Sequence, residues 1–212
     1  MNTRRHYIVF ILGILAMVIA GCGKEEEQQK GIHHTDLDPD SVIRTIAGYY
    51  SVPNPFCGLI PAPDDSARDF SFDLDDDGTY DFNIHLWHFK QEITQYCGHC
   101  DLWHPKMMTV TPLTGDAMVS ADTNAGSTEI RFYDSTMSVL PTDRWISTEA
   151  WALREDGCMI PYIGFSDTWL GLKVNDRLGW IHVARTNHNG LIISNYAINM
   201  TQGQPIRAGQ KE

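Results

Sequence analysis

Apolar and polar residues alternate in short runs along most of this chain, whereas the periodicity of an amphipathic helix is hard to find. In residues 70–74 every second side chain is Phe or Leu, and in residues 82–86 every second side chain is Phe, Ile or Leu. Such alternation lets a strand bury one face and expose the other. Further strand-like runs occupy residues 129–133, 145–151, 162–165, 169–174, 180–184 and 191–198.

These runs follow one another at intervals of roughly ten residues, which is typical of an all-β sandwich or barrel. The Asn175-Asp176 pair and residues 187–190 have the composition of hairpin turns, because Asn, Asp and Gly tolerate a positive φ. We therefore expect an all-β fold, an antiparallel β-sandwich of jelly-roll-like type. Residues 32–212 would form it as a single domain.

The first residues have the three-part pattern of an export signal. Arg4 and Arg5 precede an apolar stretch, residues 7–20, which falls short of the ~20 residues that cross a membrane. Residues 19–22 read Ile-Ala-Gly-Cys and resemble the bacterial lipobox. The resemblance implies that residues 1–21 are a signal peptide and that lipid on Cys22 attaches the protein to a membrane.

A polar segment, residues 22–31, begins with the lipidated cysteine and has the composition of a flexible tether. Lys24 followed by three glutamates resembles the surface-export signal of Bacteroidetes-type lipoproteins. Gly23 at the second position argues against retention in the inner membrane. Together these resemblances imply attachment to the outer membrane with the domain facing outward.

The chain is acidic, with 16 Lys and Arg against 27 Asp and Glu and a formal charge of −11. Removal of the signal peptide takes away Arg4 and Arg5 and leaves a charge of about −13. Nucleic-acid binding needs clustered basic side chains on phosphates, so we expect no nucleic-acid partner. An excess of carboxylates is instead compatible with divalent cations.

The strongest chemical motif lies at residues 73–81, Asp-Leu-Asp-Asp-Asp-Gly-Thr-Tyr-Asp. Carboxylates at alternate positions can curl around one hard cation, and Gly78 permits the sharp turn that this needs. Neighbouring carboxylates would repel one another without a cation. We expect the ligands to be the side chains of Asp73, Asp75, Asp77 and Asp81 and the backbone carbonyl of Thr79.

This loop resembles the Asp-x-Asp-x-Asp-Gly loops of dockerins, thrombospondin type 3 repeats and integrin-like propeller blades, which implies calcium. It departs from the EF-hand, since no helix precedes it and no glutamate stands at the twelfth position. A solvated acidic turn without metal is the alternative. A second acidic cluster, Asp36, Asp38 and Asp40, lacks the glycine and is interpreted as the solvated beginning of a strand.

Four cysteines remain after lipidation, and outside the cytoplasm an even number indicates two disulfides with three alternative connectivities. The candidates are Cys57, Cys97, Cys100 and Cys158.

The segment Cys97-Gly-His-Cys100 matches the active-site tetrapeptide of protein disulfide isomerases. That resemblance implies an alternative function, a thiol–disulfide oxidoreductase with Cys97 as nucleophile and Cys100 as resolving thiol. A thioredoxin fold, however, needs a long amphipathic helix after the motif, and residues 107–115 are β-like and then break. We favour structural disulfides.

Zinc is a further alternative, because nitrogen and sulfur ligands are close together in this part of the sequence. Zinc–thiolate sites compete poorly with oxidation outside the cell, so we do not expect zinc. The zinc candidates are His85, His88, Cys97, His99, Cys100 and His104.

The sequence shows no recognisable nucleophile motif, and we expect no catalytic residues.

Six tryptophans are spread over the domain, and core packing is the ordinary role of such large aromatics. Exposed aromatic rings can also stack on sugars. Trp87 and Trp103 flank the histidine-rich segment and are our candidates for ligand binding.

Several C-terminal segments, together with the acidic hairpin, resemble uncharacterised Bacteroidetes-type exported proteins. The resemblance implies a β-sandwich without an assigned activity. We therefore expect a lipid-anchored, calcium-stabilised module with a non-catalytic role in binding a glycan, a protein or the envelope. The segments are residues 162–165, 170–172, 179–183, 195–198 and 204–209.

Overall fold

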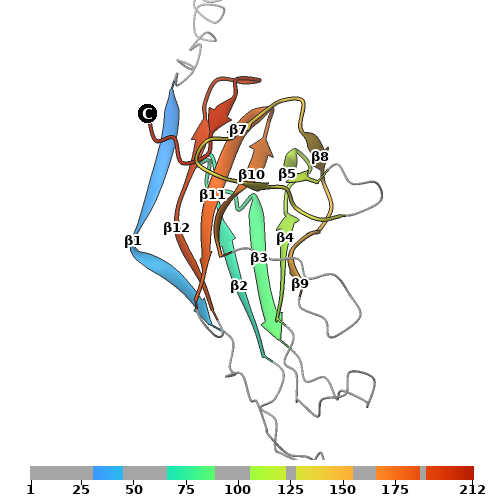
Figure 1. Ribbon diagram of the computed structural model, residues 1–212. Coiled ribbons are helices and arrows are strands. Elements are labelled where there is room, and N and C mark those ends of the chain that lie inside the picture. Colours follow the sequence, from blue (N-terminus) through green and yellow to red (C-terminus); the bar gives the residue numbers. More distant parts are fainter. Residues whose placement is uncertain (1–30, 45–65, 89–105, 123–127, 155–165, 187–189) are drawn as a thin grey trace, which may run out of the picture.

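The computed structural model of the protein describes residues 31–44, 66–88, 106–122, 128–154, 166–186 and 190–212, which are coloured in Figure 1. These residues form strands and turns and contain no helix, so the all-β prediction is confirmed. The same residues accordingly include no helix that is long and apolar enough to cross a membrane.

Most strands belong to one large antiparallel sheet, in the order β1-β12-β11-β10-β5-β8, with β6 also paired to β10. Most residues of its central strands β10 and β11 are buried, and their side chains alternate between the two faces. The bounds are β1 (Ile32–Arg44), β5 (Ala117–Ala121), β6 (Phe132–Tyr133), β8 (Arg144–Ile146), β10 (Asp167–Val174), β11 (Arg177–Arg185) and β12 (Gly190–Asn199).

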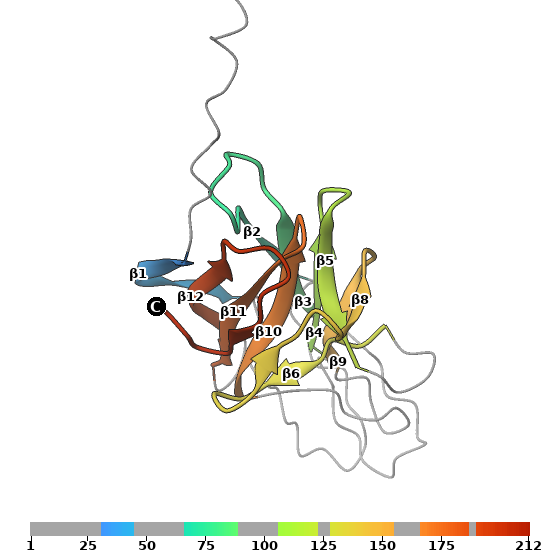
Figure 2. The same ribbon diagram turned by 90° about the horizontal axis from the view of Figure 1, so that it is seen from above.

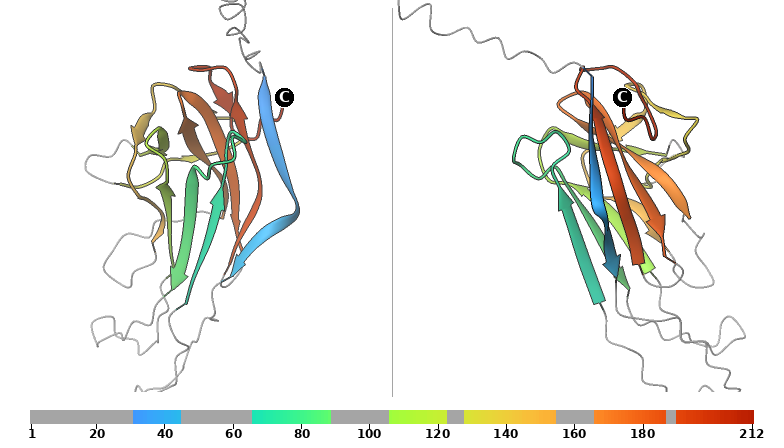
Figure 3. Two further views of the ribbon diagram at one scale, coloured as in Figure 1. Left: turned by 180° about the vertical axis from the view of Figure 1, so that it is seen from behind. Right: turned by 90° about the vertical axis from the view of Figure 1, so that its left-hand side faces the viewer.

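A second antiparallel sheet has the order β2-β3-β4-β9, and Figures 1 and 3 show it lying against one face of the large sheet. One hydrophobic cluster joins the two sheets, because it draws buried residues from strands of both. This arrangement is consistent with the expected β-sandwich. The bounds are β2 (Ser66–Phe72), β3 (Phe82–His88), β4 (Lys106–Pro112) and β9 (Ala150–Arg154).

The core between the sheets consists of the apolar positions that the alternation predicts. On the four-stranded sheet, Phe72 and Phe82 stack with ring centroids 5.5 Å apart, and Ile84 is fully buried. On the large sheet, Leu172 and Ile181 are likewise fully buried in the same cluster. Removing this apolar surface from water is the main force that holds the layers together.

A smaller core lies on the other face of the large sheet. There, the buried Trp180 and Tyr133 are covered by strands β7 (Ser138–Val139) and β13 (Ile206–Arg207), which pair with each other. Figure 2 shows the C-terminal segment with β13 on the side of the large sheet turned away from β2, β3 and β4. Both faces of the large sheet are therefore covered over part of their area.

The β10–β11 hairpin closes with the two residues that the sequence predicts. Val174 pairs with Arg177, and the intervening Asn175 and Asp176 have φ angles of 49° and 60°. Asn and Asp are the non-glycine residues that best tolerate this left-handed conformation. The other predicted turn lies largely outside the described residues, since residues 187–189 are not among them.

Some sequence-based boundaries are wrong. The acidic residues 36–40 lie within the long strand β1. The run at residues 145–151, predicted as one strand, is divided between β8 and β9, which belong to different sheets. Strands β5, β7 and β13 were not predicted, and the run at 162–165 lies outside the described residues.

Candidate metal centre

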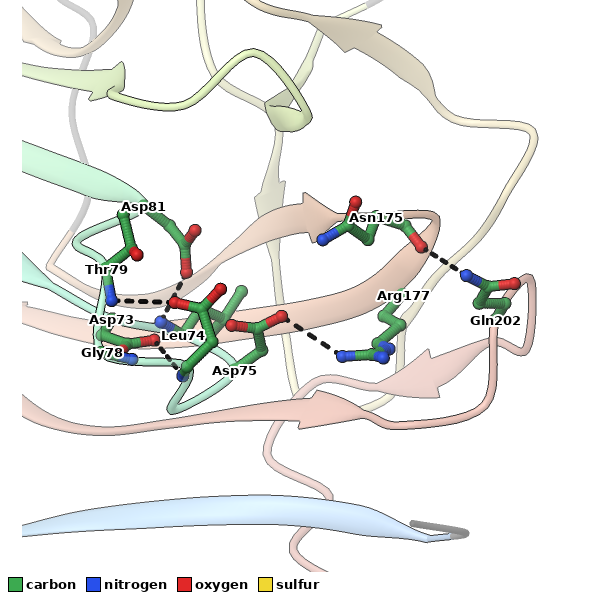
Figure 4. A network of polar contacts seen from close by, with 10 residues as sticks. Asp73, Leu74, Asp75, Gly78, Thr79, Asp81, Asn175, Arg177 and Gln202 are labelled. Atoms are coloured by element: carbon green, nitrogen blue, oxygen red, sulfur yellow. Dashed lines mark hydrogen bonds and ion pairs between the residues drawn. The ribbon is translucent and has the colours of Figure 1, made fainter. Parts of the chain in front are cut away.

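The acidic loop, residues 73–81, connects β2 to β3 and folds back on itself through its own side chains (Figure 4). Asp73 accepts hydrogen bonds from the backbone N–H groups of Asp77, at 3.3 Å, and Gly78, at 2.6 Å. The N–H of Thr79 donates to the carboxylate of Asp77 at 2.8 Å. Gly78 has a φ of 91°, a conformation that a side chain would strain.

The end of the loop is anchored at the start of β3. Asp81 is only 2% exposed, and its carboxylate accepts the N–H of Leu74 at 2.8 Å. Its own N–H donates to the carbonyl oxygen of Phe72 at 3.0 Å. Leu74 is fully buried although it lies outside a strand, because its side chain packs in the core between the sheets. The loop is thus tied down at both ends.

Asp75 reaches from this loop to the other sheet. One carboxylate oxygen, Oδ2, accepts a hydrogen bond from Nη1 of Arg177 at 3.2 Å. The side chain of Asp75 is only 4% exposed, and its other oxygen, Oδ1, is buried without a hydrogen-bond partner. A buried carboxylate oxygen without a partner is unusual and costly, so it points to a ligand at this position.

The structure brings three of the predicted ligands together. One carboxylate oxygen each from Asp73, Asp75 and Asp81 lies within 4.8 Å of the other two. The side chain of Asp77 is not in this group and accepts the Thr79 N–H instead. The exposed carboxylates of Asp36, Asp38 and Asp40 on β1 are not in it either.

The electrostatics of the group favour a cation. Burial raises the pKa of Asp81 to about 6, against an ordinary value of 3.8, and the neighbouring carboxylates add to the rise while the Leu74 N–H opposes it. Burial, followed by the charge of Asp77, also raises the pKa of Asp75, although Arg177 opposes this. Both carboxylates therefore lack enough positive charge around them in the protein alone.

Arg177 is the functional residue that sequence reasoning missed. It follows the β10–β11 turn and lies 102 positions from Asp75 in the sequence. Further contacts hold the turn, because the amide of Gln202 donates to the carbonyl oxygen of Asn175 at 3.2 Å (Figure 4). No local sequence pattern could have indicated this pairing, since it depends on how the two sheets pack.

A second feature is an aromatic cluster on the outer face of the four-stranded sheet. The ring centroids of Trp87 and Trp151 are 5.6 Å apart, and those of His85 and Trp87 are 4.8 Å apart. The rings lie over Thr109, which is fully buried although it points to the outer face. Trp87 is half-buried between His85 on its own strand and Trp151 on β9, which lies two strands away, and Trp151 is the partner that the sequence did not indicate.

Polar groups border this aromatic cluster. Asp69 accepts hydrogen bonds from the amide of Asn83 at 2.9 Å and from Nδ1 of His85 at 2.8 Å. These hydrogen bonds, that from Asn83 first, hold the pKa of Asp69 below its ordinary value. The face therefore combines flat apolar rings with an ionised acceptor and an amide.

A groove of about 620 Å³ lies where β1 and β2 approach each other at the edges of the two sheets. Its lining includes the apolar Val42 and Phe70 and the charged Arg44, Arg68 and Asp69. Neither the carboxylates of the acidic loop nor the tryptophans line it, although Asp69 belongs both to its lining and to the border of the aromatic cluster.

Several predicted site residues lie outside the described residues, and the predictions about them stand as made. They include the lipidation site Cys22, the ligand candidate Trp103 and every cysteine proposed for disulfides, redox chemistry or zinc. They are Cys22, Cys57, Cys97, His99, Cys100, Trp103, His104 and Cys158.

Comparison of the chain with protein-family models, with curated proteins and with solved structures finds no match in any of the three. The function is therefore argued from the geometry above.

Proposed function

We propose that the protein is a binding module of the outer membrane, held by lipid on Cys22 and facing outward, and that one calcium ion stabilises its β-sandwich. The calcium proposal rests on a single observation. The buried oxygen Oδ1 of Asp75 has no hydrogen-bond partner, and carboxylate oxygens of Asp73 and Asp81 lie within 4.8 Å of the Asp75 carboxylate.

The charges at the site favour a divalent ion. Three carboxylates face one guanidinium, that of Arg177, so two negative charges remain uncompensated when all three carboxylates are ionised. Calcium prefers carboxylate and carbonyl oxygens and accepts irregular geometry, whereas magnesium demands a near-ideal octahedron. The backbone carbonyl of Thr79, the carboxylate of Asp77 and water are our candidates for the remaining ligands.

The ion would link the two sheets. The loop that carries it belongs to the β2–β3 hairpin, and Asp75 pairs with Arg177 on the β10–β11 hairpin of the other sheet. Leu74 packs next to Gly179 of β11, where a Cβ would lie 3.1 Å from the Leu74 side chain. Ordering the loop around a cation therefore supports the packing of both sheets.

Calcium titration of the chelator-treated mature protein by isothermal calorimetry tests this proposal. We expect one site per chain that survives excess magnesium and is lost in Asp75→Asn. Asp76→Asn is the matched control, since Asp76 is an exposed neighbour with the same charge and is not in the group. The absence of binding by the wild type, or an equal loss in the two variants, would contradict the proposal.

For the ligand of the module we propose an uncharged glycan, bound on the outer face of the four-stranded sheet. Trp87 and Trp151 offer the flat apolar surfaces on which a sugar ring can stack, and Asp69 and Asn83 offer hydrogen-bonding groups beside them. The formal charge of the mature protein, about −13, disfavours an acidic glycan.

A glycan array probed with the mature protein tests this assignment. We expect binding to neutral glycans that is lost in Trp87→Ala and retained in Trp145→Ala. Trp145 is also half-buried, but its ring lies near Lys173 on the large sheet. Binding that both variants retain, or that neither retains despite unchanged melting, would refute a role for this face.

A further inference from the structure

Three residues with the chemistry of a nucleophilic site lie together on the outer face of the large sheet, one on each of β10, β11 and β12. Nδ1 of His182 is 2.6 Å from Oγ of Ser194, and Nε2 of His182 is 2.6 Å from Oδ1 of Asp167. An ionised carboxylate only accepts hydrogen bonds, so Nε2 carries the ring proton. Nδ1 is then left to accept the hydroxyl proton of Ser194.

A β-bulge brings Ser194 to this position. Along β11, His182 pairs with Asn195 and the next residue pairs with Ile193, so Ser194 is the extra residue. Strand β1 also passes over it, since Asp36 pairs with Asn195 and Ser41 pairs with Ile193. Neither described ladder gives Ser194 a partner. Bulges commonly re-aim a side chain in this way next to functional sites.

The bulge also explains why Ser194 points outward. Ile193 is fully buried in the core between the sheets, and Tyr196 packs against the same core. Without an extra residue, two positions three apart in a strand would point to opposite faces. The bulge lets both point inward and leaves Ser194, on the opposite side, within reach of His182.

The imidazole of His182 is held in place by its neighbours. Trp169 stands directly opposite it on β10, with ring centroids 4.6 Å apart and an angle of 30° between the planes. The C-terminal segment supports Trp169, since a Cβ on Gly209 would lie 3.4 Å from its indole. The His182 side chain is 20% exposed and that of Asp167 is 63% exposed, so solvent reaches the group.

We propose that Ser194 is a nucleophile that cleaves an uncharged carboxylic ester, with His182 as general base and Asp167 as its positioning residue. Nucleophile, base and orienting carboxylate have the mutual distances that such chemistry requires. The ring nitrogens are exchanged relative to the serine proteases, but either nitrogen of an imidazole can accept the proton. The exposed Asp167 and Asp36 nearby disfavour an anionic substrate.

In the first step, Oγ of Ser194 bonds to the carbonyl carbon while its proton moves to Nδ1 of His182. The bond to the alcohol oxygen then breaks, and His182 returns the proton to the departing alcohol. Water attacks the acyl-serine by the same route, releasing the carboxylic acid and restoring Ser194. Asp167 stays ionised throughout and stabilises the imidazolium. The Cα register gives Ser194 no partner on β11, and we assign its N–H as donor to the developing oxyanion.

Reaction of the full mature protein with a fluorophosphonate probe, followed by peptide mass spectrometry, tests this. We expect one adduct at Ser194, and hydrolysis of p-nitrophenyl acetate that stops when the adduct forms. Ser71 is the internal control, because its hydroxyl donates to Asn83 at 3.0 Å on an exposed face. No adduct at Ser194 in the folded wild type, or equal labelling of Ser71, would overturn the proposal.

Variants separate the roles of the two partners. His182→Gln removes the base and should slow labelling roughly 100-fold or more. Asp167→Asn should slow it as well, whereas Asp167→Glu, which keeps a carboxylate at this exposed position, should restore much of the rate. A labelling rate at Ser194 that His182→Gln leaves unchanged, at an unchanged melting temperature, would also overturn the proposal.

Discussion

The cluster of three carboxylates, Asp73, Asp75 and Asp81, predicts how the stability of the calcium-free protein depends on pH. The pKa of Asp81 is about 6 in the folded protein, against an ordinary value of 3.8. The folded state therefore binds the Asp81 proton more tightly than the unfolded chain does. This contribution to stability is fully present below about pH 4 and is lost as the pH rises through about 6. In chelator, we expect the protein to become less stable across this range.

The size of the effect follows from the shift. A pKa difference of about two units corresponds to ~3 kcal/mol of lost stability at neutral pH. For a domain of this size, each kcal/mol moves the melting temperature by about 2–4 °C, so the expected fall is roughly 6–12 °C. Calcium at ~100 times its dissociation constant would restore about 2.7 kcal/mol.

Thermal melts followed by circular dichroism, at pH 5 and pH 7.5 and in chelator or calcium, measure both the loss of stability with rising pH and the stabilisation by calcium. Asp81→Asn isolates the residue, because an amide oxygen can still accept the Leu74 N–H but carries no charge. In chelator at pH 7.5 we expect this variant to melt above the wild type and to lose the calcium response. If the wild type and the variant show the same pH dependence in chelator, the reasoning about Asp81 is wrong.

Three further predictions follow from the fold and its surroundings. Leu74→Ala should cost about 2–5 kcal/mol in a chemical denaturation experiment, because Leu74 is fully buried between the sheets; a loss well below 1 kcal/mol would refute its place in the core. Arg177→Met should destabilise the protein in chelator by about 3–5 kcal/mol, since Asp75 would lose its partner, and by less in calcium; equal losses under both conditions would argue against a shared site. Non-reducing peptide mapping should find Cys97 and Cys100 bridged separately to Cys57 and Cys158, whereas a labile bond between Cys97 and Cys100 would favour the oxidoreductase alternative.

The sequence predicts the inner strands well because their pattern is local. Alternating apolar residues mark a pleated surface with one buried face, and such runs coincide with much of β3 and β10–β12. Membership of a sheet is not a local property. The pattern predicts one strand over residues 145–151, yet the structure divides them between β8 and β9, which join different sheets.

The acidic strand β1 shows a different limit. Asp36, Asp38 and Asp40 are interpreted from the sequence as the solvated beginning of a strand, whereas the structure places them inside β1, the edge strand of the large sheet. Charged side chains are common on edge strands, where they prevent pairing with other chains. A hydrophilic sequence is therefore compatible with a strand at this position.

The candidate sites also divide into residues that local spacing indicates and residues that only the packing of the sheets brings together. Asp73, Asp75 and Asp81 could be chosen from spacing because one short loop holds them. Arg177 could not, because it pairs with Asp75 only through the packing of the two sheets. The group formed by Asp167, His182 and Ser194 has no sequence motif, since its members come from three adjacent strands and depend on a bulge.

The most direct test of the proposed calcium site is the metal content of the mature protein purified from the envelope without added metal. Elemental analysis should find about one calcium per chain in the wild type and none in Asp75→Asn, with the Asp76→Asn control retaining the ion. A wild-type protein that is folded and carries no calcium, or whose calcium survives Asp75→Asn unchanged, would contradict the account.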